Sequence, residues 1–258
     1  MNAVLITGAC KNTGVDIVEK FASENYNVIF TGRDMERIIE AEKKYKEKFP
    51  GKFIRGYKLI PLNGDLSVDE KSVIEMFEFF DRENIFIKDL VLNAADLGVG
   101  ISFFDSPLSD YMKVINTNMT WNYCLCVHAA ERMAKNGGGS ITFINSNTSY
   151  RAIPERIAYS ASKGGQLGMM RAMALDLGPE NIRVNAVLPG MIRTDRWDKN
   201  PGMYENLPSR HTPLGDVATG KDIADAVWYF TAMARNTTGA ELTVDGGNTI
   251  QLYPVIKG

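Results

Sequence analysis

The chain has 258 residues, of which 45% are hydrophobic and 23% are charged, so it is long enough to bury the core of an ordinary α/β domain. Its formal net charge of −2 provides no strong field of one sign, and we therefore expect neither nucleic acid nor an anionic membrane as a partner. Because the apolar runs are far shorter than the roughly 20 residues of a membrane helix and no signal-peptide pattern opens the chain, we predict a cytoplasmic protein.

Short apolar runs alternate with stretches of helical periodicity along the chain. The predicted strands are residues 3–7, 27–31, 58–62, 90–94, 141–145, 182–187 and 241–244. After a first helix that carries Ile17, the predicted helices are residues 34–49, 68–80, 107–135, 157–177 and 220–234. This order predicts a single doubly wound Rossmann-type domain over 1–258, with a parallel sheet of about seven strands flanked by helices on both faces. Ligands of such sheets bind beyond the carboxyl ends of the strands.

The first predicted strand runs directly into TGACKNTGVD at residues 7–16, a turn of mostly small residues before a helix. Backbone N–H groups of such a turn can approach a phosphate, and the dipole of the following helix favours the same negative charge. Gly8 would form the turn, and Gly14 would let the helix start close to the strand. Asn12 stands where a further glycine would be expected, and asparagine tolerates a left-handed backbone. We predict a phosphate-binding turn; an ordinary glycine turn is the alternative.

The second predicted strand ends in FTGRD at residues 30–34. An acidic residue at the end of this strand would bind the adenosine ribose and favour NAD. Gly32 and Arg33 stand there instead, and Lys11 of the first turn could converge with Arg33 on a 2′-phosphate. We therefore expect NADP(H) in preference to NAD(H). Asp34 follows directly and keeps NAD(H) open, and the alternative for Arg33 is a side chain that only meets solvent.

The stretch AYSASKGG at residues 158–165 places Tyr159 and Lys163 four residues apart, on one face of a helix. The ordinary pKa of tyrosine is about 10, and an adjacent ammonium would lower it. A tyrosine tuned in this way can exchange a proton near neutral pH, which is general acid–base catalysis. The small neighbouring residues would let a cofactor ribose lie against the helix. A surface Tyr–Lys pair without catalytic role is the alternative.

Two further polar residues fit such a site. Ser146 follows the apolar run ITFIN, so it lies at the carboxyl end of a predicted strand, where its hydroxyl could bind a carbonyl oxygen. Asn118 shares the apolar face of the long helix with Trp121. Its amide should therefore be buried and needs partners, such as a water or a backbone carbonyl near Lys163.

Together these motifs resemble the classical short-chain dehydrogenase/reductase family over about residues 2–250. TGACKNTG is similar to the family's TGxxxGxG turn, and LNAA at 92–95 is similar to its NNAG. NIRVNAVLPG at 181–190 resembles NxRVNxxxPG, and VDGG at 244–247 resembles the family's strand-end signature. The catalytic tetrad of the family is matched by Asn118, Ser146, Tyr159 and Lys163. Asn12, Leu92 and Ala95 depart from the family pattern, at positions that in the family line the cofactor or support the sheet.

The resemblance implies an NADP(H)-dependent oxidoreductase that interconverts a ketone and a secondary alcohol. In reduction Tyr159 would protonate the carbonyl oxygen, which Ser146 polarises. Lys163 would lower the pKa of Tyr159 and hold the nicotinamide ribose, and Asn118 would position a water that extends a proton path from Lys163. The implied cofactor-binding residues are Gly8, Lys11, Asn12, Thr13, Gly14, Arg33, Asp65, Leu66, Asn93, Ala94, Tyr159, Lys163, Pro189, Gly190, Ile192 and Thr194.

The segment at about 191–217 carries several apolar side chains and could close over an apolar ligand, or could pack on the protein's own helices. We expect a fairly apolar substrate such as a hydroxysteroid or ring ketone. The alternatives are the substrate of a 3-oxoacyl-carrier-protein reductase, a polyol or sugar, and an idle dinucleotide sensor without turnover. The expected substrate-lining residues are Ser146, Thr148, Ile153, Met191 and Trp197.

No metal site is predicted, because the three cysteines are odd in number and not spaced for zinc, and neither His128 nor His211 has a metal-type partner nearby. The resemblance also implies a homotetramer, or a homodimer, whose interface uses the helices at 107–135 and 157–177.

Overall fold

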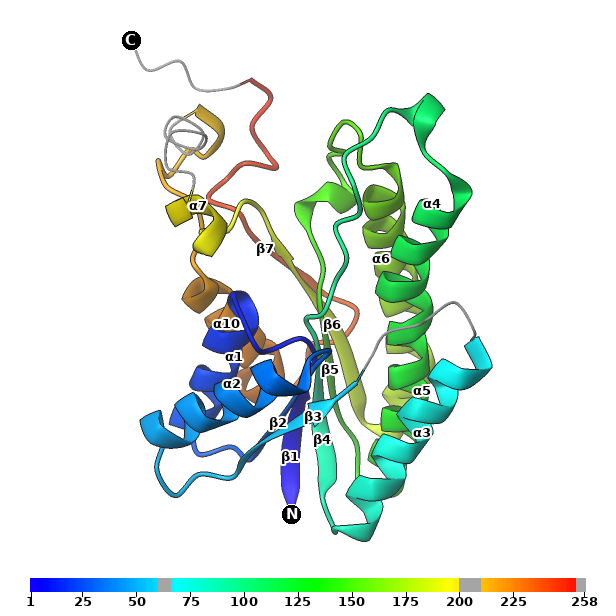
Figure 1. Ribbon diagram of the computed structural model, residues 1–258, viewed down its shortest axis with the longest axis vertical. Helices are drawn as coiled ribbons and strands as arrows, with labels where there is room; N and C mark the ends of the chain where they lie inside the picture. The colour runs from blue at the N-terminus through cyan, green and yellow to red at the C-terminus, as the bar shows by residue number, and fades with distance from the viewer. Residues whose placement is uncertain (60–65, 200–209, 254–258) are drawn as a thin grey trace.

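Seven parallel strands form one sheet in the order β3-β2-β1-β4-β5-β6-β7 in the computed structural model, which describes residues 1–59, 66–199 and 210–253 (Figure 1). The strands are β1 Asn2–Ile6, β2 Val28–Gly32, β3 Ile54–Lys58, β4 Phe86–Leu92, β5 Gly139–Ile144, β6 Ile182–Pro189 and β7 Glu241–Val244. The chain builds outward from β1 to β3 and then returns to place β4 beside β1. The order of strands therefore switches between β1 and β4, where doubly wound sheets bind their ligands.

Helices cover both faces of the sheet, as the alternation of strands and helices predicts (Figure 1). On one face lie α1 Thr13–Ser23, α2 Met35–Lys48 and α10 Gly220–Trp228. On the other lie α3 Leu66–Arg82, α5 Trp121–Lys135 and α6 Ile157–Leu177. Two shorter helices are α4 Leu108–Ile115 and α7 Asp195–Lys199.

Alternating strand residues supply the two apolar cores. In β1, Val4 and Ile6 join the core that contains Phe21 of α1, whereas Leu5 joins the core that contains Phe77 of α3. Because both faces are covered, the central strands are apolar at nearly every position, and this makes them visible in the sequence. The bounds of α6 and β7 agree with the predicted helix at 157–177 and strand at 241–244.

The predicted positions of the third and fourth strands are wrong. The third strand is Ile54–Lys58, paired with β2, and residues 60–62 of the predicted strand lie outside the described residues. Its polar composition reflects an edge strand, for which a continuous apolar run is not required. The fourth strand begins at Phe86, ahead of the predicted Leu90, and includes a buried acid. Asp89 is accommodated there because the hydroxyl of Ser140 on β5 donates to its carboxylate at 2.6 Å.

Two predicted helices contain a π-helical segment. The helix expected over 107–135 is α4, a π segment at Asn116–Thr120 and α5, and the helix expected over 220–234 is α10 followed by a π segment at Tyr229–Met233. π segments are rare and frequently lie at functional sites. The first of these two contains Asn118. Among the described residues, no helix is both long and apolar enough to cross a membrane.

Candidate active site

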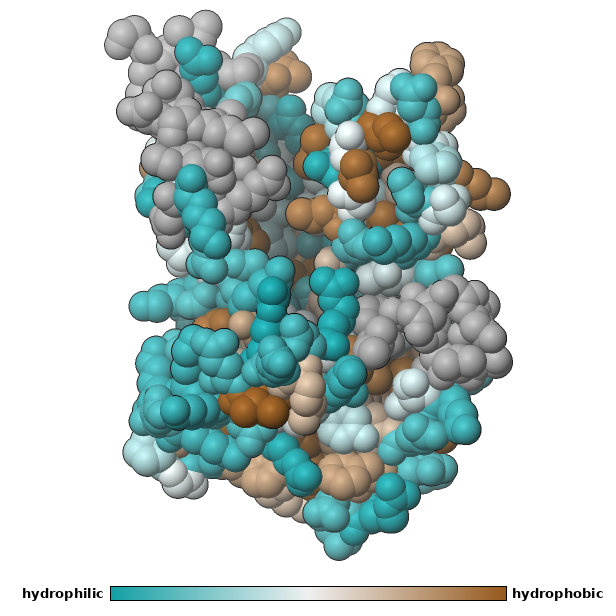
Figure 2. Space-filling view, in the orientation of Figure 1, coloured by the Kyte–Doolittle hydropathy of each residue, from teal (hydrophilic) through white to brown (hydrophobic). Residues whose placement is uncertain are grey.

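A cavity of about 610 Å³ opens over the carboxyl ends of β1, β2, β4, β5 and β6. Figure 2 shows the molecule hollowed in its upper half, above the sheet of Figure 1. The predicted site residues that line it are Gly8, Lys11, Asn12, Thr13, Gly14, Arg33, Asn93, Ala94, Ser146, Tyr159, Lys163, Pro189, Gly190, Ile192 and Thr194. One continuous crevice therefore joins the two motifs that the sequence places far apart, the glycine turn and the Tyr–Lys pair.

The turn between β1 and α1 needs its small residues. Gly8 has a φ of +66°, and a Cβ added there would lie 2.9 Å from the Cβ of Ala94. A Cβ at Gly14 would lie 2.6 Å from the Cα of Ala9, so only glycine lets α1 start this close to the strand. Asn12 precedes α1 with a φ of 51° and a ψ of −143°, so the expected positive φ is present at this departure from the family pattern. This backbone region strongly favours glycine, and Asn12 therefore holds a strained conformation.

Asn93 fixes the same turn from the end of β4. Its side-chain amide donates to the carbonyl oxygens of Thr7 at 2.9 Å and Gly8 at 3.2 Å. In return the Thr7 hydroxyl accepts from the backbone N–H groups of Asn93 at 3.0 Å and Ala94 at 2.9 Å. The turn is thus tied to the end of β4, the strand beside β1, and the backbone N–H groups of Gly8 and Ala9 donate to the hydroxyl and the carbonyl oxygen of Thr31 at 3.3 Å and 3.0 Å.

Ser146, Tyr159 and Lys163 meet at the other end of the crevice. Ser146 follows β5, and its side-chain oxygen accepts from the backbone N–H of Thr148 at 3.2 Å and hydrogen-bonds the Tyr159 phenol. Lys163 is only 1% exposed, and its Nζ donates to the carbonyl oxygen of Ile144 at 2.8 Å. The same Nζ lies 5.7 Å from the centroid of the Tyr159 ring. The phenol and the ammonium therefore share one face of α6, and both line the crevice.

The electrostatics of this pair differ from the expected ones. Burial raises the pKa of Tyr159, and the hydrogen bond with Ser146 only partly opposes that rise. Burial also lowers the pKa of Lys163 to about 7. The expectation that Lys163 lowers the tyrosine pKa is therefore wrong for the protein alone, because removal from water favours the neutral form of both groups. Tyr159 is held as a protonated phenol, the form that can donate.

Asn118 lies behind the crevice and is fully buried in the π segment. Its side-chain oxygen accepts from the backbone N–H of Asp96 at 2.8 Å, and its amide donates to the Asp96 carbonyl and to the Ser162 hydroxyl, each at 2.9 Å. The backbone carbonyl of Asn118 accepts from the side-chain amides of Asn122 at 2.7 Å and Gln166 at 2.6 Å. The amide thus ties the loop after β4 to α6, beside Lys163.

Three cations line the opposite end of the crevice, which are Lys11, Arg33 and Arg37. Arg37 was not predicted from the sequence, although it stands four residues after Arg33, in the first turn of α2. Asp34, the residue that kept NAD(H) open, caps α2 by accepting from the Glu36 backbone N–H at 3.0 Å, and its carboxylate lies 3.7 Å from Nε of Arg37. The acid is therefore already bound to the helix terminus and to a cation.

The other predicted residues either do not line the cavity or lie outside the described residues, except for Ala95. Thr148, Ile153, Met191 and Trp197 are not among the described residues that line the cavity. Asp65 lies outside the described residues, and Leu66 begins α3. Part of the segment 191–217 also lies outside them. Leu92, a departure from the family pattern, is buried in the core, and Ala95, the other one, lines the crevice.

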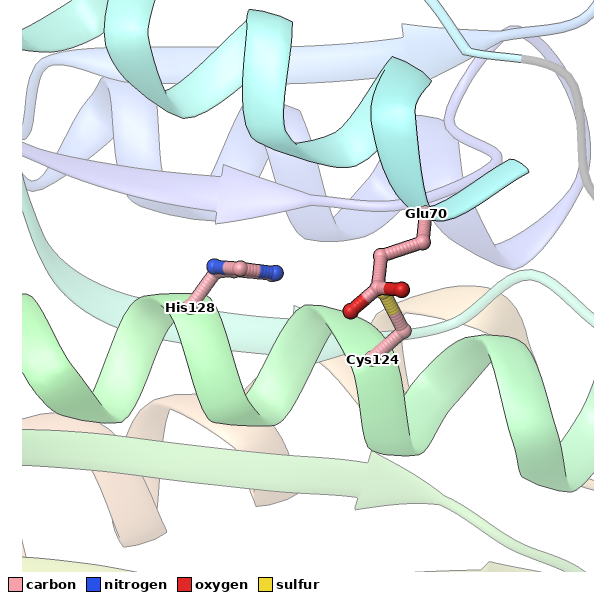
Figure 3. Close-up of side chains that lie close together, drawn as sticks. All are labelled: Glu70, Cys124 and His128. Atoms are coloured by element: carbon pink, nitrogen blue, oxygen red, sulfur yellow. The ribbon is translucent and has the colours of Figure 1, made fainter. Parts of the chain in front are cut away.

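The prediction that His128 has no metal-type partner is wrong. Its imidazole lies close to the thiol of Cys124 and the carboxylate of Glu70, and these three groups have ligand atoms within 4.8 Å of one another (Figure 3). Cys124 and His128 stand four residues apart on α5, a spacing that the sequence displays. Glu70 comes from α3, so only the packing of the two helices completes the group.

Comparison with known proteins yields a family model, described as Enoyl-(Acyl carrier protein) reductase, that matches residues 8–249. The 3alpha-hydroxysteroid dehydrogenase of Mediterraneibacter gnavus is 31% identical, with 94% of each chain covered. The NADP-dependent (R)-specific alcohol dehydrogenase of Lentilactobacillus kefiri is 31% identical, with 96% of each chain covered. The solved structure of ElxO with NADP bound has a TM-score of 0.82 and 28% identity, and the alignment covers 97% of this chain and 99% of that one.

Proposed function

This chain belongs to the short-chain dehydrogenase/reductase family of nicotinamide-dependent oxidoreductases of CH–OH and C=O groups, and from that premise we propose that it reduces a fairly apolar ketone with NADPH. The observation that carries the proposal is the single crevice that has a buried Tyr159–Lys163 pair at one end and three cations at the other.

The residues of the crevice fit a nicotinamide dinucleotide. The backbone of the turn at residues 8–14 faces the crevice at the start of α1, where a phosphate group is favoured by both N–H donors and the helix dipole. Pro189, Gly190 and Thr194 line the far wall beside Lys163. When bound, the nucleotide would supply the hydride for the carbonyl carbon. The protein's own residues supply binding, orientation and the proton.

The protonated phenol of Tyr159 supports the reduction direction. A carbonyl oxygen placed beside Ser146 and Tyr159 would accept a hydrogen bond from each hydroxyl and then the proton of the phenol as negative charge develops on it. Lys163, with a pKa of about 7, can hold or release a proton at neutral pH from a position beside the same ring. Asn118 positions Ser162, the residue that precedes Lys163, through the hydrogen bond at 2.9 Å.

The wall near Tyr159 supports an apolar substrate. Ala95, Leu97 and Ile192 line the crevice, and Leu97 is 54% exposed. Apolar surface of this kind binds ring systems and alkyl chains and offers little to a polyol. The relative named 3alpha-hydroxysteroid dehydrogenase supports this class.

A panel of substrates tests the proposed function. NADPH consumption should be fastest with ring ketones and hydrophobic aliphatic ketones, slower with sugars, and slow with acyl thioesters. The measurement is the loss of NADPH absorbance with purified protein and equal concentrations of each compound. Turnover only with a 3-oxoacyl thioester, or only with a sugar, would contradict the apolar ketone and identify that compound class as the substrate. Binding of NADPH without turnover of any compound would favour the dinucleotide sensor.

The preference for NADPH rests on the charges at the adenosine end. Arg33, Arg37 and Lys11 provide cations where a 2′-phosphate would lie, and Asp34 is engaged by the α2 terminus. A charge-assisted hydrogen bond is worth about 1.5–3 kcal/mol, which is a factor of roughly 10–100 in affinity. Replacing Arg33 with Ala should therefore weaken NADPH binding by about that factor and change NADH binding little.

Fluorescence titration of both nucleotides measures the effect of Arg33→Ala. Lys43→Ala is the matched control, because Lys43 is an exposed cation of α2, the helix that follows Arg33, and does not line the crevice. It should leave both affinities unchanged. An equal loss of NADPH and NADH affinity in Arg33→Ala would show that the guanidinium does not bind the 2′-phosphate.

We also infer that copies of the chain associate through the helices at 107–135 and 157–177. Several apolar side chains on these helices are exposed, namely Leu108, Met112, Tyr123, Ile157 and Leu175. Light scattering should give a mass of two or four times the 28.6 kDa chain. The mass of a single chain at micromolar concentration would exclude this interface.

A further inference from the structure

Three side chains of different chemistry converge between α3 and α5, outside the nucleotide crevice (Figure 3). Glu70 comes from the start of α3, and Cys124 and His128 come from successive turns of α5. A carboxylate oxygen, a thiol sulfur and an imidazole nitrogen lie within 4.8 Å of one another. We propose that these three residues bind one divalent transition-metal ion of the Zn²⁺ class, which joins α3 to α5.

The spacing suits a tetrahedral ion. Zinc bonds of about 2.0–2.3 Å place ligand atoms roughly 3.5 Å apart, so the three atoms need to approach by little more than about 1 Å. Residues four apart on a helix share one face, so Cys124 and His128 are already aligned by the backbone of α5. The opposite helix is held in place because Val73 and Phe77 of α3 pack in one core with Leu125 and Ala129 of α5.

The donors select the class of ion. Thiolate and imidazole prefer Zn²⁺ and its neighbours in the first transition row, whereas Mg²⁺ and Ca²⁺ prefer sets of oxygen ligands. The thiolate and the carboxylate supply two negative charges for a divalent cation. Binding breaks the S–H bond of Cys124, whose proton passes to solvent, and forms the S–metal bond. Glu70 is exposed, so a water can take the fourth position from the solvent side.

The surroundings of His128 support a ligand role. Its side chain is only 16% exposed, and its ring packs 6.3 Å from the ring of Phe77. Figure 3 shows the imidazole extending toward the other two side chains. Glu131 Oε2 lies 4.0 Å from Nδ1, close enough for a small rotation to let it accept that N–H, and a carboxylate on the second ring nitrogen is the usual partner of a metal-bound histidine. Arg132, the cation four residues after His128, is already paired with Asp81 at 2.7 Å, so its positive charge is compensated.

A Co²⁺ titration tests the site, because thiolate–Co²⁺ bonds give a charge-transfer band that oxygen and nitrogen ligands do not. The full chain is reduced, freed of metal with a chelator and titrated with Co²⁺, followed by Zn²⁺. We expect one equivalent of Co²⁺ per chain with the charge-transfer band, and displacement of that ion by Zn²⁺. Zn²⁺ at a hundredfold excess over its Kd should raise the Tm by roughly 5–10 °C.

Single variants identify the ligands. Cys124→Ser should abolish the charge-transfer band, and His128→Gln and Glu70→Gln should each weaken Co²⁺ binding by at least about tenfold. Cys10→Ser and His211→Gln are matched controls, because they remove the same side-chain types elsewhere and should bind Co²⁺ like the wild type. Far-UV circular dichroism checks the fold of each variant. Should Cys124→Ser fail to fold, the Co²⁺ affinity of His128→Gln tests the site instead.

The proposal fails if the wild type shows no charge-transfer band on titration with Co²⁺. It also fails if the band survives in Cys124→Ser or is lost in Cys10→Ser, or if the affinity of His128→Gln equals that of the wild type. These results do not depend on turnover, so they leave the proposed oxidoreductase function unaffected.

Discussion

Replacement of Tyr159 with Phe is expected to lower kcat/KM for ketone reduction by about 10²–10⁴-fold, the usual contribution of a positioned general acid. The variant keeps the buried ring and loses only the hydroxyl, which hydrogen-bonds Ser146 and is held protonated by burial. NADPH affinity should change by no more than a few-fold, because the phosphate turn and the cations at the other end of the crevice are untouched. NADPH consumption and a nucleotide titration on the same preparation measure both effects.

Tyr229→Phe is the matched control for this experiment. Tyr229 begins the second π segment, is 43% exposed and does not line the crevice, so its variant should turn over like the wild type. Unchanged turnover in Tyr159→Phe would remove the phenol from the mechanism and with it the proposed reductase chemistry.

The replacement Lys163→Met should move activity and stability in opposite directions. Loss of the cation beside Tyr159 is expected to lower kcat/KM by about 10²–10³-fold, within the range of acid–base and electrostatic contributions. Burial of the Lys163 ammonium destabilises the folded state. The lowering of its pKa to about 7 reflects this cost. Removing that cost outweighs the hydrogen bond to Ile144, worth about 1 kcal/mol, so the variant should be more stable near pH 7 by a few kcal/mol.

The pH dependence separates this effect from ordinary repacking. The unfolded chain binds the Lys163 proton up to its ordinary pKa of 10.5, whereas the folded chain releases it near 7. Between these values the unfolded wild type binds more protons, so wild-type stability rises with pH in this window. The advantage of Lys163→Met should therefore be largest at and below about pH 7 and shrink toward about pH 10.5.

Urea unfolding of the wild type and of Lys163→Met at both ends of this window measures the difference. A variant that is less stable than the wild type at every pH would show that Lys163 stabilises the fold. A difference that does not change with pH would show that the buried ammonium is not its cause.

The parts of the fold that follow directly from local pattern were predicted from the sequence. Helix α6 and strand β7 have continuous periodicity with clear ends, and their bounds were predicted correctly. Strand β3 was misplaced because an edge strand carries polar residues such as Arg55 and Lys58, so the apolar run that follows attracted the prediction. The π segment around Asn118 was not predicted, because no pattern in this one sequence distinguishes it from the α-helix on either side.

The residues of the candidate site likewise divide into those that local sequence pattern predicts and those that only tertiary packing brings together. Lys11, Arg33 and Ser146 were found because each follows a recognisable strand, and strand ends meet at one edge of a parallel sheet. The partners of Asn118 were missed, since Asp96 and Ser162 reach it only through tertiary packing. The direction of the Tyr159 pKa depends on burial, which the Tyr–Lys spacing does not reveal. Glu70 joins Cys124 and His128 for the same tertiary reason.

A crystal structure of the protein with NADPH tests the central claim most directly. We expect the 2′-phosphate to contact Arg33, the ribose of the nicotinamide to contact Lys163, and the nicotinamide ring to face Ser146 and Tyr159. A nucleotide bound outside this crevice, or one whose nicotinamide ring points away from Tyr159, would contradict it.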